Sequence, residues 1–159
     1  MQVDYYCLLE QEKVWRDINE LALACGSYGG TYRVHAHKPG AALCWHPYNM
    51  MRIGRATGED PLGLLYVGAA EDFRVDFISL WASLGPVRAD VAEHPVGKAF
   101  SASEALRRRF RLLCFTLRFS ADPAATQAEE LAAYTAEYGE LPPLHQLAVR
   151  QREALAAIA

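Results

Sequence analysis

The chain has 159 residues, of which 52% are hydrophobic and 22% charged, and its formal net charge is −3 at pH 7. This composition is typical of a folded globular protein and excludes an intrinsically disordered one. The length predicts a single domain over residues 1–159 that buries roughly 70% of the surface of the unfolded chain. The negative charge excludes a global attraction to nucleic acid, so phosphate binding would need a local basic patch.

The N-terminal residues and the cysteines indicate the compartment. The chain begins without the basic start and apolar run of a signal peptide, and no stretch approaches the ~20 apolar residues that a membrane span needs. The four cysteines are far apart and include no Cys-x-x-Cys pair, which favours reduced thiols. We therefore expect a soluble cytoplasmic protein without a membrane partner, and the sequence leaves its oligomeric state unknown.

Hydrophobic periodicity, caps and chain breakers predict the secondary structure. Asp72 and Ser103 are candidate helix caps, and Gly139 is placed to end a helix. In chain order, the expected elements are a helix over 8–25, a strand over 31–36, a glycine- and proline-rich connection over 37–62 with a short strand near 50–53, a strand over 62–70, helices over 73–84, 87–94 and 103–109, a strand over 110–119, and helices over 123–138 and 144–158.

The strand over 110–119 carries the clearest pattern. Both of its faces are apolar, with Leu112 and Cys114 on one side and Leu113, Phe115 and Leu117 on the other. Cover on both faces indicates a central strand. Strands separated by helices, and too few of them for a doubly wound sheet, predict an α+β fold with a small central sheet of about three strands flanked by helices.

Two motifs place a tyrosine beside a glycine on the first two predicted strands: Gly30-Thr31-Tyr32 and Leu65-Tyr66-Val67-Gly68. Further along, the glutamate pair Glu129-Glu130 on a predicted helix precedes Gly139-Glu140-Leu141-Pro142-Pro143-Leu144. The stretch His94-Pro95-Val96-Gly97-Lys98 lies between the second tyrosine motif and the glutamate pair. In this order the motifs resemble the GIY-YIG nuclease domain over residues 29–146. The resemblance implies that family's fold, with extra helices at both ends of the chain.

The resemblance also implies a reaction. GIY-YIG domains are metal-dependent nucleases, so it implies cleavage of phosphodiester bonds in DNA or RNA with Mg²⁺ or Mn²⁺. By carry-over, Tyr32 and Tyr66 are the catalytic tyrosines, and Glu129 is the catalytic metal ligand, or Glu130 if the register slips by one. Carboxylate oxygens suit these cations, which neutralise charge on the phosphate. The competing interpretation of both tyrosines is a half-buried strand position, where aromatic residues are favoured.

Two positions depart from the family pattern. Asp76 stands where the family has its catalytic arginine, and His145 stands where it has an asparagine. An aspartate repels a phosphate that an arginine would bind. We assign the missing cation to Arg74, with Arg52 and Arg55 as other candidates. Substrate binding is assigned to Lys98, Arg107, Arg108 and His145, although the arginine run also fits a solvated helix end.

Two functions remain open at this point. The retained tyrosines and glutamate favour an endonuclease, of full or reduced activity. The missing arginine favours a catalytically inactive relative that binds nucleic acid or a protein partner. A separate alternative is a zinc site, because two pairs of zinc-type side chains stand at alternate positions, His35 with His37 and Cys44 with His46.

Overall fold

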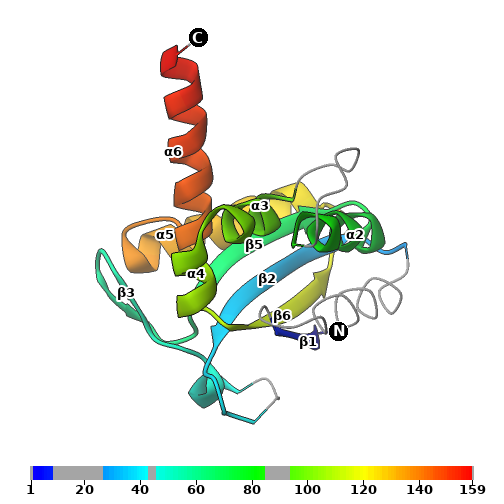
Figure 1. Ribbon diagram of the computed structural model, residues 1–159. Helices are drawn as coiled ribbons and strands as arrows, with labels where there is room; N and C mark the ends of the chain where they lie inside the picture. Colours follow the sequence, from blue (N-terminus) through cyan, green and yellow to red (C-terminus); the bar gives the residue numbers. More distant parts are fainter. Residues whose placement is uncertain (1, 9–26, 43–45, 85–93, 159) are drawn as a thin grey trace.

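The computed structural model describes residues 2–8, 27–42, 46–84 and 94–158. The fold is α+β, with helices on both faces of an antiparallel sheet (Figure 1). The strands are β1 (Gln2–Leu8), β2 (Gly30–His37), β3 (Ile53–Arg55), β4 (Gly58–Asp60), β5 (Leu64–Ala70) and β6 (Leu112–Phe119). The helices are η1 (Pro47–Asn49), α2 (Phe73–Leu84), α3 (Pro95–Ala102), α4 (Glu104–Arg109), α5 (Pro123–Tyr138) and α6 (Pro143–Ile158).

The main sheet has four strands in the order β1-β6-β2-β5, and all of its neighbours are antiparallel. The central position expected for residues 110–119 is confirmed, because β6 lies between β1 and β2. The sheet also contains β1, a strand that the sequence did not indicate. Strands β3 and β4 pair with each other in a separate hairpin. Leu8, the first residue of the helix expected over 8–25, belongs to β1. The rest of that helix, and residues 87–93 of the helix expected over 87–94, lie outside the described residues.

Alternate side chains of β2 divide the sheet into two faces. Tyr32 and Val34 join an apolar cluster with Phe77 of α2 and Phe100 of α3, and we call this side the tyrosine face. Thr31 and Arg33 point to the other side, where they contact α5, and we call it the α5 face. The division decides which candidate residues can share a site.

Local capping explains why several helix boundaries were predictable. The Oδ1 atom of Asp72 accepts hydrogen bonds from the backbone N–H groups of Arg74 and Val75 at the start of α2. Ser103 caps α4, and Gly139 ends α5 with a φ of 74°, a left-handed conformation that favours glycine. By contrast, α3 was not predicted, and its cap is His94, a residue that rarely has this role.

The turn between α5 and α6 holds the β3–β4 hairpin against the domain. Glu140 accepts a hydrogen bond from the backbone N–H of Ala56 at 2.9 Å and forms an ion pair with Arg55 at 3.1 Å. The backbone N–H of Thr57 bonds to the carbonyl of Tyr138 at 3.1 Å. The segment that resembles the family's closing pattern therefore has a packing role in this chain. Beyond it, α6 projects away from the body of the domain (Figure 1).

Candidate functional site

A hydrogen-bonded cluster forms around the hydroxyl of Tyr32 on the tyrosine face. Tyr32 is 1% exposed, and its Oη atom lies 2.6 Å from Oδ2 of Asp76 and 2.5 Å from Nε2 of His94. Nδ1 of His94 accepts the backbone N–H of Val96, so the ring proton of the neutral imidazole is on Nε2. The bonds then run in one direction: His94 donates to Tyr32, and Tyr32 donates to Asp76.

The pKa shifts in this cluster keep the proton on the phenol. Burial, together with the negative charge of Asp76, raises the pKa of Tyr32 well above its usual value. Burial also acts to raise the pKa of Asp76, but the contact with His94 and the hydroxyl of Tyr32 outweigh it and lower this pKa overall. At neutral pH Tyr32 is therefore a neutral donor to an ionised carboxylate. Asp76 is also the polar end of the cluster that reaches solvent, since its side chain is 32% exposed.

Tyr66 lies on the same face, 6.2 Å from Tyr32 between ring centroids. The ring of His145 stacks on Tyr66 at 4.3 Å, with an angle of 9° between the planes. Nε2 of His145 lies 3.1 Å from the backbone nitrogen and 2.8 Å from the carbonyl oxygen of Val67. Because β5 is an edge strand, these backbone groups face away from the sheet, and His145 protects them from pairing with another strand.

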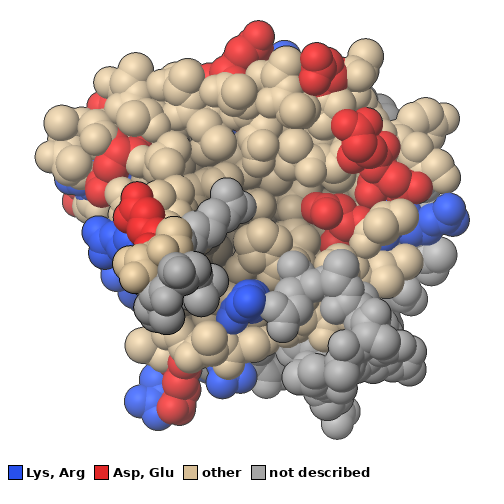
Figure 2. Space-filling model, turned by 90° about the horizontal axis from the view of Figure 1, so that it is seen from above, with Lys and Arg blue, Asp and Glu red and all other residues tan. Residues whose placement is uncertain are grey.

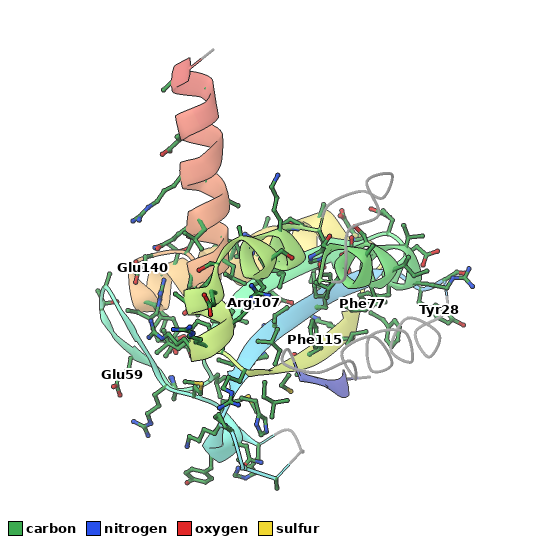
Figure 3. The ribbon with its side chains drawn as sticks, in the orientation of Figure 1. Tyr28, Glu59, Phe77, Arg107, Phe115 and Glu140 are labelled. Carbon is green, nitrogen blue, oxygen red and sulfur yellow. The ribbon has the colours of Figure 1, made fainter. Side chains whose placement is uncertain are left out.

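The basic candidates are exposed on three helices. Arg74 is exposed at the start of α2, and its Nη2 atom is 3.4 Å from the hydroxyl of Ser27. Lys98 is exposed on α3. Arg107, which is labelled in Figure 3, and Arg108 are exposed on α4. Arg108 pairs with Glu104 at 2.6 Å. None of these contacts places a guanidinium at the hydroxyl of Tyr32, which bonds to Asp76 and His94.

The glutamate pair belongs to the α5 face. Glu130 is buried and accepts hydrogen bonds from Oγ1 of Thr31 at 3.0 Å and Nε of Arg33 at 2.7 Å. Thr31 and Arg33 flank Tyr32 along β2, so Glu130 lies on the opposite side of the sheet from the phenol. Glu129 is exposed and lines a cavity on the α5 face with Arg33. The structure thus separates the glutamates from the tyrosines.

The arrangement of carboxylates does not fit the metal that the family resemblance implies. Within the described parts of the chain, no three His, Cys, Asp or Glu residues lie close enough to hold an ion. Glu130 is occupied by a hydroxyl and a guanidinium, and Arg118 lies a further 3.6 Å from it. Asp76 is bound to Tyr32. A Mg²⁺ or Mn²⁺ site shared with the tyrosines would need a second carboxylate on their face.

The histidines of the proposed zinc site are engaged by the backbone. Nδ1 of His35 lies 3.0 Å from the carbonyl oxygen of Leu62, and both ring nitrogens of His37 contact carbonyl oxygens, those of Lys38 and Ala42. His46 is exposed and caps η1, and Cys44 lies outside the described residues. Zinc binding would require His37 to give up at least one of its two carbonyl contacts.

Comparison of the chain with protein-family models, curated protein sequences and solved structures finds no match. Among the helices that the structure describes, none is both long and apolar enough to cross a membrane. The GIY-YIG resemblance therefore stays a proposal based on motifs and their order. The surface in Figure 2 is mostly uncharged in its described part, with acidic side chains gathered toward the right and a basic side chain near the centre.

His94 and Asp76 are the site residues that sequence reasoning did not assign. His94 was noted as part of a His-x-x-Gly-Lys stretch without a role, and Asp76 as a departure from the family. The signal available in the sequence was that both residues are unusual at their positions. A helix-capping histidine and an acidic residue in place of an arginine could have suggested mutual contact, but their closeness in space depends on the packing of α3 against α2.

Proposed function

We propose that this chain is a GIY-YIG-like domain that binds nucleic acid without cleaving it by the family's metal-dependent reaction. The observation that carries the proposal is the position of Asp76, a carboxylate bonded to Tyr32 where the family has its arginine. A neutral phenol whose pKa is raised, and whose hydroxyl already donates to a carboxylate, is a poor general base for an attacking water. The glutamates on the opposite face cannot share one phosphate with that phenol.

A basic patch on α3 and α4 supports the binding part of the proposal. Its members are exposed and lie on these two helices or directly after them: Lys98, Arg107, Arg108, Arg109 and Arg111. The helices contact each other, so the charges belong to one region of the surface. Such a patch supplies the local attraction that the net charge of −3 does not.

The patch makes binding dependent on salt. We expect wild type to bind fluorescently labelled single- or double-stranded DNA or RNA, with log K falling as log salt rises. The double variant Arg107→Gln and Arg109→Gln should bind more weakly and lower the salt slope by about 1 to 2. Fluorescence anisotropy at several salt concentrations measures both quantities.

The matched control is Arg52→Gln, which removes an exposed arginine paired with Glu59 on the separate hairpin. It should leave affinity and slope unchanged. Equal losses of affinity in the control and the double variant would show that nucleic acid is attracted to exposed arginines in general and not to the patch. If no nucleic acid binds at low salt, the proposal is wrong and a protein partner becomes the better explanation.

The alternative function is a nuclease of reduced activity that uses Mg²⁺ or Mn²⁺. It is favoured by one observation, the placement of Tyr32 and Tyr66 on one face beside the partly exposed Asp76. It would require Glu129 to act at a site other than the tyrosine cluster. Binding alone does not separate the two functions, and cleavage does.

A further inference from the structure

A cavity of about 340 Å³ lies on the α5 face, opposite the tyrosine cluster. Its volume falls at the lower end of the range for small-molecule sites. The walls combine apolar side chains of β5 with aromatic side chains of α5, among them Leu64, Val67, Tyr134 and Tyr138. Two arginines, Arg33 of β2 and Arg118 of β6, also line it.

The two arginines converge on one buried carboxylate. Glu130 is 2.7 Å from Nε of Arg33 and 3.6 Å from Nη1 of Arg118. The side chains of Arg33 and Arg118 are 43% and 67% exposed. The contact of Arg33 with Glu130 uses Nε, which leaves the terminal nitrogens of this guanidinium for a ligand. Two positive charges around one negative charge make this end of the cavity locally cationic.

The floor of the cavity adds no positive charge. Burial lowers the pKa of His35 to about 4, so its imidazole is neutral at pH 7. Asp60, which also lines the cavity, is buried and accepts hydrogen bonds from the backbone of Leu62 and Leu64 and from the hydroxyl of Tyr134. The competing negative charges are the buried carboxylate of Asp60 and the exposed Glu129 and Glu137 on α5, which would favour a cation.

We propose that this cavity binds a small amphipathic anion, with a carboxylate or phosphate group between Arg33 and Arg118 and an apolar body against Leu64, Val67 and Tyr134. Guanidinium groups match the planar geometry of such oxyanions and can bind them through two hydrogen bonds. The buried Glu130 holds the two arginines in place. This site is independent of the nucleic-acid proposal, because it uses the opposite face of the sheet from the tyrosines.

Three probes of similar size test the sign of the preferred charge. We expect phenyl phosphate or benzoate to bind in isothermal titration calorimetry, and benzylamine not to bind. The two anions separate a phosphate-selective site from a carboxylate-selective one. Binding of benzylamine without binding of either anion would overturn the proposal in favour of the acidic rim. Absence of binding by all three at millimolar concentration would overturn it as well.

Variants then locate the bound anion. Arg118→Gln should weaken binding of the anion roughly tenfold or more, because the complex loses a hydrogen bond to a charged group. The double variant Arg33→Gln and Glu130→Gln removes a charge pair together, so it should weaken binding without leaving a buried charge unpaired. Arg52→Gln on the separate hairpin is the control and should leave the affinity for the anion unchanged. Unchanged affinity in both Arg118→Gln and the double variant would refute the site, and thermal unfolding verifies that each variant is folded.

Discussion

Replacing Gly68 by alanine is expected to cost about 1–3 kcal/mol of unfolding free energy, the usual range for forcing a methyl group into a packed core. Gly68 is paired with Tyr32 across β5 and β2, and a Cβ atom at Gly68 would overlap the ring of Tyr32 near its hydroxyl. The ring cannot move aside without losing its bonds to Asp76 and His94. Urea unfolding measures the loss.

A control and a rescue separate this overlap from the general effect of a glycine replacement. Gly54→Ala on β3 should be close to neutral, because nothing lies within 4 Å of a Cβ atom there. In a Tyr32→Leu background the cost of Gly68→Ala should fall, since the ring that it meets is gone. Equal costs of Gly68→Ala in both backgrounds would show that the overlap is not its cause.

Replacing Tyr32 by phenylalanine should also cost about 1–3 kcal/mol at neutral pH, the penalty for leaving buried polar partners unsatisfied. The hydroxyl is the shared partner of Asp76 and His94, so both lose a hydrogen bond. Asp76→Asn removes the charge of Asp76 and keeps its shape. Because Tyr32 and Asp76 bond to each other, a double-mutant cycle of Tyr32→Phe with Asp76→Asn should give a non-zero coupling energy. Urea unfolding of the four proteins supplies the cycle.

The unfolding free energy that Tyr32→Phe loses should depend on pH in a defined direction. The pKa of Asp76 is lowered in the folded protein, so its contribution to stability is present above the ordinary aspartate pKa, about 3.9. It is lost as the pH falls through the folded-state pKa. The difference between wild type and Tyr32→Phe should therefore shrink in acid. Tyr48→Phe, at a residue that is 78% exposed, should change neither stability nor its pH profile; a pH-independent loss in Tyr32→Phe would contradict the role of Asp76.

Those elements whose ends are fixed by neighbouring residues were predictable from the sequence. The bounds expected for 73–84 and 123–138 agree with α2 and α5, because Asp72 and Gly139 act within one turn. By contrast, β1 depends on pairing with β6, more than a hundred residues later in the chain. A seven-residue strand of this kind gives no reliable local signal.

The site was less predictable because sequence motifs do not determine which face of the sheet a helix covers. The tyrosine pair shares one face, as the alternation of β2 and β5 implied. Glu130 contacts Thr31 across a separation of 99 residues, and its side of the sheet depends on how α5 packs. The glycine of the second motif has a steric reason in this structure, since Gly68 makes room for the ring of Tyr32.

Cleavage of nucleic acid tests the central claim most directly. Wild type is incubated with single- and double-stranded DNA and RNA in Mg²⁺ or Mn²⁺, and the products are separated by gel electrophoresis. We expect no cleavage above the protein-free control. Asp76→Arg should be equally inactive, because the glutamates stay on the opposite face of the sheet. Cleavage by wild type that is lost in Glu129→Ala would contradict the account and establish the nuclease.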